Sequence, residues 1–264
     1  MFVSVVIITK NEASTIGKCL AAAKRITDDV IVIDNGSTDG TPNIAMMAGC
    51  RLYHEKWYGY GINKNRAANL ALYDWILSLD ADEIIDDELI NSINNLNPDA
   101  ISNMYDIRFR AYYDAKPVRF GTWGRDHHIR LFNRNYTNWT EPLVHETLVK
   151  PGDASIQKLP GFVHHYSVKT MEQYRSKITH YARLNARKYL KEGKKTTPVK
   201  LYLAPTYHFL KNYIFLLGIL DGKRGLAIAK IMAEHTRLKY LYLRQYTVHT
   251  EKEYFAKEKF SVEY

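Results

Sequence analysis

Two aspartates one residue apart, Asp80 and Asp82, follow an apolar run at 75–79. Such a run predicts a strand buried in an α/β sheet, and open α/β sheets bind ligands at the carboxyl ends of their strands. Two carboxylates in an extended turn can approach one hard cation, and a Mg²⁺ or Mn²⁺ held in this way can bridge phosphate groups. The pair therefore predicts a divalent-metal site, whereas the acids at 86–88 are typical of the first turn of a helix.

Two further polar segments follow strand-like runs. Residues 9–12 (Thr-Lys-Asn-Glu) come after the β-branched run 3–8, and residues 34–41 (Asp-Asn-Gly-Ser-Thr-Asp-Gly-Thr) come after the run 30–33. By itself the second segment predicts only a turn with a helix N-cap. Because adjacent parallel strands end on one rim, we expect three strand ends to converge on one polar crevice.

The elements that position these segments are predicted by periodicity. Helical patterns at 16–23, 42–48 and 67–73 lie between the strand-like runs, which predicts βαβ units and a parallel sheet. Alternation from 104 to 132 predicts antiparallel strands added to that sheet. The C-terminal part predicts amphipathic helices at 201–220 and 226–246, after a surface linker at 191–198.

The predicted fold class is therefore α/β, with a Rossmann-like, mostly parallel central sheet flanked by helices and a C-terminal helical extension. We expect a first domain over 1–168, composed of two halves (1–100 and 101–168). The helical extension covers 169–264.

Composition excludes several classes of protein. With 264 residues, of which 46% are hydrophobic and 25% charged, the chain is neither disordered nor collagen-like. Two cysteines cannot form a disulfide framework, and the N-terminus lacks the basic region of a signal peptide, so we expect a cytoplasmic protein. The longest apolar stretch, 209–220, contains Lys211 and Asn212 and is shorter than the roughly 20 residues that span a bilayer.

Charge is distributed unevenly. The formal charge is −3 up to Val168 and +12 beyond it. A basic segment indicates an anionic partner, which can be nucleic acid, acidic lipid or a phosphorylated substrate. Because no known nucleic-acid-binding motif occurs in this segment, we do not expect nucleic acid as the partner.

In their order and spacing, residues 5–12, 34–41 and 80–83 (Asp-Ala-Asp-Glu) resemble the inverting glycosyltransferases of family 2, which have the GT-A nucleotide-sugar-binding fold. The resemblance extends to the branch that contains bacterial lipopolysaccharide inner-core β-glucosyltransferases. It covers nearly the whole chain, and the first 90 residues are more specific to the family than the acceptor side. The resemblance implies that 1–168 is a GT-A catalytic domain with a nucleotide-sugar-binding half (1–100) and an acceptor half (101–168). The supporting segments are 59–65, 130–134, 144–146, 164–166 and 218–225.

The resemblance implies how the donor, a UDP-sugar, is bound by the first two segments. Thr9, Asn11 and Glu12 belong to the donor site, with Thr9 and Glu12 against uracil and ribose. Asp34 is implied to accept a hydrogen bond from the base, and Asp39 to order its loop.

The resemblance also implies the groups around the diphosphate. Asp82 ligates the Mn²⁺ or Mg²⁺ that holds the diphosphate, and Asp80 binds the ribose or a metal-bound water. Lys64 and Asn65 reach the donor, although Lys64 can equally be an ordinary surface lysine. His165 or its neighbour His164 supplies an imidazole to the metal or the diphosphate.

The general base is not determined by the resemblance. Many family 2 enzymes carry the catalytic carboxylate in a Glu-Asp pair, and this sequence contains no such dipeptide. Inversion needs one base that takes the proton of the acceptor hydroxyl. Glu146 is the first candidate, followed by Glu141 and His145; as an alternative, Glu146 forms a salt bridge with Arg125 or Arg130.

The predicted function is metal-dependent transfer of a hexose, with glucose the first choice, from a UDP-sugar to a lipid-anchored glycan such as the lipopolysaccharide inner core. Another lipid-linked or peptide acceptor is the alternative. A nucleotidyltransferase is disfavoured because residues 9–12 lack a glycine-rich loop. We expect the helices within 201–246 to bind the anionic inner face of the cytoplasmic membrane; alternatively they cap the catalytic domain or form a dimer interface.

Overall fold

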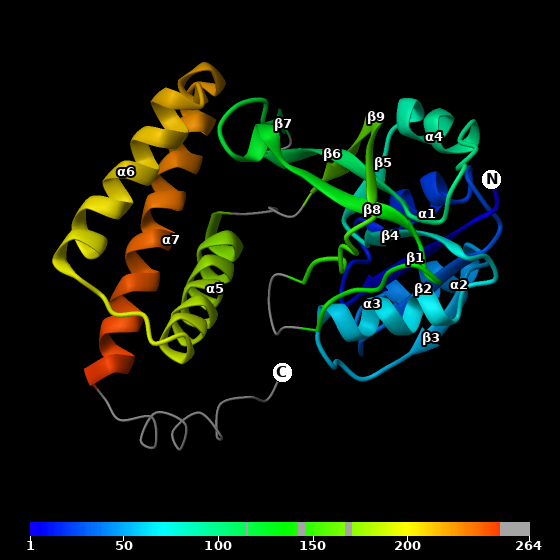
Figure 1. Cartoon of the computed structure of the whole chain (residues 1–264), viewed down its shortest axis with the longest axis horizontal. Coiled ribbons are helices and arrows are strands. Elements are labelled where there is room, and N and C mark those ends of the chain that lie inside the picture. The colour runs from blue at the N-terminus through cyan, green and yellow to red at the C-terminus, as the bar shows by residue number, and fades with distance from the viewer. Residues whose placement is uncertain (115, 142–145, 167–170, 249–264) are drawn as a thin grey trace. The chain divides into compact units, whose positions relative to one another are not determined.

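The structure is a computed structural model that describes residues 1–114, 116–141, 146–166 and 171–248 (Figure 1). The chain folds into two compact units. The first comprises Met1–Tyr112 and Arg125–Ser167, and the second comprises Tyr113–Gly124 and Val168–Tyr264. The carboxylates singled out above all lie in the first unit.

One sheet forms the centre of the first unit, with the strand order β3-β2-β1-β4-β8-β6-β9-β5. β1 pairs in parallel with β2 and β4, β2 pairs in parallel with β3, and β8 is antiparallel to β4 and β6. The predicted α/β fold, a parallel sheet extended by antiparallel strands, is confirmed. The strands are β1 (Val3–Thr9), β2 (Val30–Asp34), β3 (Arg51–His54), β4 (Trp75–Asp80), β5 (Glu83–Ile85), β6 (Asn103–Tyr113), β8 (His127–Asn133) and β9 (Ser155–His165).

Helices cover both faces of this sheet (Figure 1). Alternate residues of β1 point to opposite faces, because side chains in a strand alternate. Val5 and Ile7 pack with α1 (Ile16–Ala23), α2 (Thr41–Met47) and α4 (Asp87–Asn94). Val6 and Ile8 pack with α3 (Tyr60–Asn69) on the other face. A strand buried on both faces explains why the run 3–8 is almost continuously apolar.

A buried carboxylate, Asp29, fixes the chain where α3 leads into β4. It accepts hydrogen bonds from the Leu72 N–H at 2.7 Å and from the Ser4 hydroxyl, and Ser4 Oγ accepts the Tyr73 N–H at 2.9 Å. Arg51 of β3 lies 2.8 Å from the same carboxylate. Residues 72 and 73 therefore leave the helix that the pattern at 67–73 predicts, and α3 ends at Asn69.

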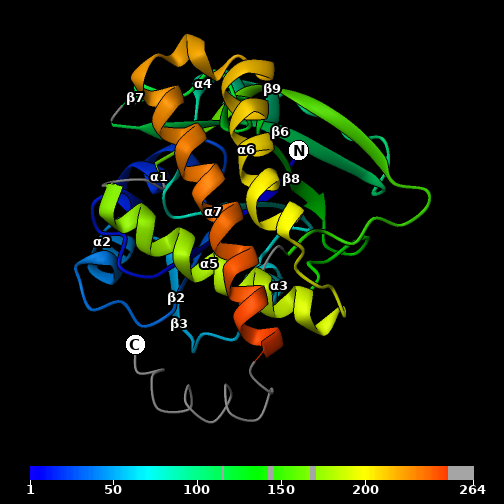
Figure 2. The same cartoon turned by 90° about the vertical axis from the view of Figure 1, so that its left-hand side faces the viewer.

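The second unit is mainly helical (Figures 1 and 2). α6 lies against α7, and α5 packs on α7 from another side. The elements are β7 (Lys116–Pro117), α5 (Met171–Lys191), the π-helical turn η2 (Val199–Leu203), α6 (Ala204–Leu210), the π-helical turn η3 (Lys211–Phe215), the 3₁₀ turn η4 (Gly218–Asp221) and α7 (Lys223–Val248).

The helix predicted at 201–220 is not continuous to its end. Its helical part ends at Leu216, and Leu217 adopts a left-handed conformation with φ of 60°. Gly218 then packs so closely on the Asn212 carbonyl that a Cβ atom there would lie 2.5 Å from the oxygen. The predicted helix at 226–246 is confirmed as the greater part of α7.

We predict that Asp29→Asn lowers the free energy of unfolding by about 1–3 kcal/mol, because one amide group cannot accept all of these hydrogen bonds. Burial alone would raise the pKa of Asp29, but the hydrogen bonds from Ser4 and Leu72 and the Arg51 partner lower it. This stabilisation is therefore present above the unfolded pKa of about 3.9 and is lost as the pH falls through the lower folded pKa.

Urea unfolding of both proteins over a pH series tests this prediction, and Asp28→Asn at the neighbouring exposed position is the control. The difference between wild type and Asp29→Asn should shrink in acid. A difference that stays constant to the lowest pH measured would contradict the assignment.

Candidate active site

Three neighbouring parallel strands end at one edge of the sheet. Thr9 closes β1 opposite Asp34 of β2, and Ile8 lies opposite Asp80 of β4. The three polar segments of the sequence therefore meet at this edge, as their order predicted. We call Thr9, Asp34, Asp80 and the loops that follow them the polar rim.

Side chains tie together the loops that follow β1 and β2. The Asn11 side-chain oxygen accepts the Thr38 N–H at 2.7 Å. The Asp39 carboxylate accepts the N–H of Ala13 at 3.1 Å and of Thr41 at 3.0 Å. Asp39 thus orders its own loop and the neighbouring one, while Asn11 lies at the surface and holds the two loops from the other side.

Several buried oxygen atoms on the rim lack hydrogen-bond partners in the described part of the chain. Thr9 Oγ1 and Asp34 Oδ1 are two of them, and Asn35 Oδ1 and Asp80 Oδ1 are the others. The other Asp34 oxygen accepts the Ser37 N–H at 3.1 Å and lies 3.3 Å from His54 Nδ1. Glu12 is half-buried in the loop next to Thr9. Since buried polar atoms are nearly always hydrogen-bonded, several such atoms on one edge indicate a site that a polar ligand completes.

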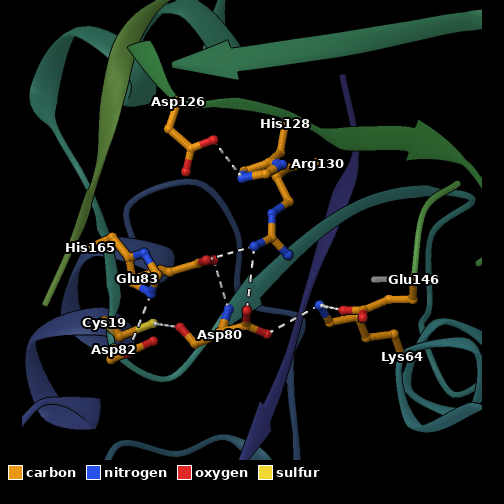
Figure 3. Close-up of polar contacts among 10 residues, drawn as sticks. All are labelled: Cys19, Lys64, Asp80, Asp82, Glu83, Asp126, His128, Arg130, Glu146 and His165. Atoms are coloured by element: carbon orange, nitrogen blue, oxygen red, sulfur yellow. Dashed lines mark hydrogen bonds and ion pairs between the residues drawn. The ribbon is translucent and has the colours of Figure 1, made fainter. Parts of the chain in front are cut away.

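Five side chains of alternating charge, the charge chain, continue along the rim: Glu146, Lys64, Asp80, Arg130 and Glu83 (Figure 3). Lys64 Nζ lies 2.8 Å from Glu146 Oε1 and 3.3 Å from Asp80 Oδ1. Arg130 Nη2 lies 3.3 Å from Asp80 Oδ2 and 2.6 Å from Glu83 Oε1. The side chains of Lys64 and Arg130 are only 3% and 8% exposed, so these carboxylates compensate cations that water scarcely reaches.

The environments of Asp80 and Glu83 move their pKa values in opposite directions. Burial would raise the pKa of Asp80, but the charges of Lys64, Arg130 and His165 outweigh it and hold the pKa well below its usual range. Burial raises the pKa of Glu83, and the charge of Asp80 adds to the rise despite Arg130. Asp80 is therefore the carboxylate that stays ionised.

Asp82 and His165 form a second group beside the charge chain (Figure 3). His165 Nε2 lies 3.4 Å from Asp82 Oδ2, because Glu83 of β5 pairs with His165 of β9. Burial lowers the pKa of His165, but its hydrogen bond to Asp82 and the charge of that residue outweigh burial and raise the pKa.

A carboxylate and an imidazole fit a divalent cation that takes its other ligands from water and phosphate. Asp80, in contrast, is engaged by Lys64 and Arg130. In the part of the chain that the structure describes, no group of three His, Cys, Asp or Glu side chains is placed to hold a metal. Asp82 and His165 are therefore the pair that we propose as protein ligands, and the place of Asp80 in a metal site stays a prediction.

Contacts with α3 position the segment that carries Glu146. Asn65 donates to the Trp139 carbonyl at 2.9 Å and accepts the Trp139 N–H at 2.8 Å. A Cβ atom on Gly61 would lie 1.9 Å from the Thr140 carbonyl oxygen, so only glycine allows α3 to pack here. Thr140 then pairs with Thr147, where its N–H donates to the Thr147 carbonyl at 2.8 Å.

The remaining predicted site residues lie in different surroundings. Asn65 was predicted to reach the donor, but its amide is occupied by the backbone of Trp139. Glu141 is exposed and lines a hollow of about 220 Å³ together with Arg134. His145 lies outside the described residues. His164 faces the Tyr112 hydroxyl at 3.1 Å, so of the two histidines it is His165 that faces Asp82.

The structure also decides the alternatives left open by the sequence. Lys64 is not a surface lysine, because its side chain is buried within the charge chain. Glu146 pairs with Lys64 rather than with Arg125 or Arg130. The acids at 86–88 do begin a helix, since Asp86 caps α4 by accepting the Leu89 N–H at 2.8 Å.

Sequence reasoning did not identify Arg130 and Glu83 as members of the site. Glu83 was part of the motif at 80–83, but its complete burial could not be inferred from a motif followed by three more acids. Arg130 stands in a strand with alternating apolar residues, where a single buried arginine requires an acid partner. An arginine within an apolar strand was therefore the feature of the sequence from which a buried ion pair at Arg130 could have been inferred.

Comparison with known proteins gives concordant results. The family model described as glycosyl transferase family 2 matches residues 4–149. An uncharacterized glycosyltransferase of Rickettsia prowazekii is 30% identical over 94% of this chain and 89% of its own length. The lipopolysaccharide core biosynthesis glycosyltransferase LpsC of Rhizobium meliloti is 26% identical over 88% of this chain and 92% of its own.

Among solved structures, the chain is similar to residues 1–349 of TarS from S. aureus in complex with UDP-GlcNAc. The TM-score is 0.46 and the sequence identity is 14%, with 94% of this chain and 92% of that chain covered.

We predict that Arg130→Met lowers the free energy of unfolding by about 3–5 kcal/mol, because Glu83 then remains buried without its cation. The double variant Arg130→Met/Glu83→Gln should recover part of the loss, since it removes both charges. Arg25→Met breaks an exposed ion pair with Asp87 and should cost less than about 1 kcal/mol. Urea unfolding measures all three, and equal losses for Arg130→Met and Arg25→Met would contradict the prediction.

Proposed function

The chain belongs to glycosyl transferase family 2, and on that premise we propose that it transfers a hexose with inversion from a UDP-sugar to a lipid-anchored glycan. The observation that supports this proposal is the polar rim, where neighbouring strands end in unpartnered buried oxygens such as Thr9 Oγ1 and Asp34 Oδ1 and in the motif that carries the Asp82–His165 pair. A nucleoside diphosphate matches both groups. Its nucleoside can hydrogen-bond to the unpartnered oxygens, and its diphosphate can bind a cation held by Asp82 and His165.

Donor binding begins at the ends of β1 and β2. Asp34 Oδ1 would accept the N–H of the uracil ring, and Thr9 Oγ1 would complete the contact with the nucleoside. Glu12, on the adjoining loop, is proposed to lie against the ribose. Asn11 and Asp39 act indirectly by holding the two loops in place.

The diphosphate would lie next to Asp82 and His165, which would hold Mn²⁺ or Mg²⁺. Such a cation, when bound, neutralises the negative charge that develops on the leaving UDP. Asp80 would accept a hydrogen bond from the ribose or from a metal-bound water. Its low pKa keeps it an acceptor throughout the working pH range.

Glu146 is proposed as the general base. The acceptor oxygen attacks the anomeric carbon from the face opposite the diphosphate, its proton passes to the Glu146 carboxylate, and the bond from the anomeric carbon to UDP breaks. The products are the inverted glycoside and UDP. Lys64 orients Glu146 through the 2.8 Å contact and links it to Asp80, so a single buried cation connects the base with the donor side of the site.

The acceptor is proposed to be the inner core of lipopolysaccharide and the donor sugar to be glucose. The name of the Rhizobium meliloti relative, a lipopolysaccharide core biosynthesis glycosyltransferase, supports this acceptor class. The chain covers 92% of that relative, so the likeness extends through both units.

Thermal unfolding with a panel of UDP-sugars, with and without Mn²⁺, tests the donor assignment, because a ligand that binds the folded state raises the apparent stability. UDP-glucose with Mn²⁺ should give the largest shift among UDP-glucose, UDP-galactose and UDP-N-acetylglucosamine. ADP-glucose is the matched control for the base, and an equal shift with it would contradict uracil recognition.

We predict that Asp82→Ala abolishes turnover and removes the metal dependence of UDP binding, because the diphosphate then meets an acidic rim without a cation. Calorimetry with UDP, with Mn²⁺ or with EDTA, measures this. Asp87→Ala, an exposed acid in the first turn of α4, is the control and should bind as wild type does. Equal affinity with and without EDTA in the wild type would remove the metal from the mechanism.

We predict that Glu146→Gln leaves UDP-sugar binding intact and lowers kcat on the order of 10²-fold or more. Glutamine keeps the shape and can still accept the hydrogen bond of Lys64, but it cannot take a proton. Glu141→Gln is the matched control. If Glu146→Gln turns over at the wild-type rate while Glu141→Gln is inactive, the base is Glu141.

A further inference from the structure

The second unit exposes a concentrated set of apolar side chains. Half of the large hydrophobic side chains that are exposed in the described part of the chain lie within residues 199–220. Leu203, Tyr207 and Leu210 recur at intervals of four and three residues along α6 and its N-cap, which is the spacing of one helical stripe, and Ile214, Phe215 and Leu217 are exposed beyond the end of α6. We call the exposed side chains of 199–220 the apolar face.

The apolar face is distinct from the packing side of the same segment. α6 and η2 both pack on α7, and Leu201 of η2 and Ile228 and Ile231 of α7 are buried. Figures 1 and 2 both show the two helices running side by side. Phe215, in contrast, is 70% exposed, and Leu203 is 61% exposed. The segment is therefore apolar on two sides, of which α7 covers only one.

The charged residues of this segment indicate which kind of partner binds the apolar face. Residues 193–220 contain no Asp or Glu but contain four lysines, and two of these lie within 199–220, namely the exposed Lys200 and the half-buried Lys211. The first acid beyond this stretch is Asp221, and it is buried with its carboxylate on the N–H groups of Arg119 and Phe120. The apolar face thus presents only positive charge.

We propose that this face binds an anionic lipid surface, with the axis of α6 in the plane of the interface. An apolar stripe flanked by lysines suits the boundary between acyl chains and acidic headgroups. Tyr202 and Tyr207, 65% and 57% exposed, are the amphipathic side chains that gather at such boundaries. Among the described residues no helix could span a bilayer, so the binding is peripheral.

The structure narrows the surface expected from the sequence. The expectation covered both helices within 201–246 and included cations such as Lys230 and Arg237. In α7, Ile228, Ile231 and Leu243 are buried and Val248 is the exposed large apolar side chain, so this helix contributes exposed cations such as Lys230 and Arg237 but little apolar surface. The proposal therefore rests on residues 199–220 alone, and it is independent of the transfer reaction, since vesicle binding needs neither donor nor acceptor.

Vesicle flotation of the full-length protein tests the proposal. The wild type should float at low salt with phosphatidylcholine vesicles that contain phosphatidylglycerol, and much less with phosphatidylcholine alone or at high salt. Lys200→Gln/Lys211→Gln should weaken binding about thirtyfold, because each cation near such a surface contributes about fivefold. Leu203→Ser/Phe215→Ser should weaken it on the order of tenfold or more.

Matched controls separate the apolar face from general effects of charge and hydrophobicity. Lys18→Gln/Lys150→Gln removes two exposed lysines of the first unit, and Met46→Ser/Met47→Ser removes two exposed apolar side chains there. Both control proteins should float as the wild type does, and thermal unfolding shows whether each variant is folded.

Three results would overturn the proposal: no flotation of the wild type with anionic vesicles, equal losses in the control variants, or equal binding to neutral vesicles. Light scattering measures the oligomeric state and so tests the alternative partner of the apolar face, which is a second copy of the chain. A dimer that becomes monomeric in Leu203→Ser/Phe215→Ser and never floats would assign the apolar face to self-association.

Discussion

The burial of two cations at the end of the sheet is the constraint on which the site depends. Lys64 and Arg130 come from a helix and a strand on different sides of β4, and both turn toward Asp80. A buried cation that loses its acid destabilises a protein far more than an exposed pair that is broken. α3, β4 and β8 must therefore keep their relative positions here. These positions fix where Glu146 and Glu83 lie, at the two ends of the charge chain.

This constraint divides the acids of the motif at 80–83 between separate tasks. Asp80 is neutralised by the protein itself and serves as a fixed, ionised acceptor. Glu83 accepts the Asp80 N–H at 2.9 Å and faces Arg130, so it is part of the framework. Asp82 points toward His165 and is the member of the motif that combines with an imidazole. Neighbouring carboxylates thus acquire different roles from the groups around them, as their opposite pKa shifts indicate.

The strand ends were predictable because β1, β2 and β4 are runs whose apolar residues and polar ends are adjacent in sequence. β3 was not predicted, because its four residues are only half-buried or exposed at the edge of the sheet and leave no apolar pattern. The charge chain could not be predicted either. Arg130 pairs with acids 47 and 50 positions away, and Lys64 pairs with Glu146 at a separation of 82. Only the tertiary fold brings these pairs together, whereas the hydrogen bond from the Thr41 N–H to Asp39 is local, with a separation of 2.

Polar contacts add to the packing on α7 in fixing residues 199–220 within the second unit. Asn212 is buried, and its side-chain oxygen accepts the N–H and the hydroxyl of Thr122, while Asp221 holds the backbone of Arg119 and Phe120. Gly225 allows an equally close approach, since a Cβ atom there would lie 1.7 Å from the Gly218 carbonyl oxygen. Because these contacts already anchor the segment, its large apolar side chains are not required for the core of the unit. Their number and their uniform positive surroundings are then explained by a contact outside the unit, since exposed apolar area of this extent is unfavourable in water.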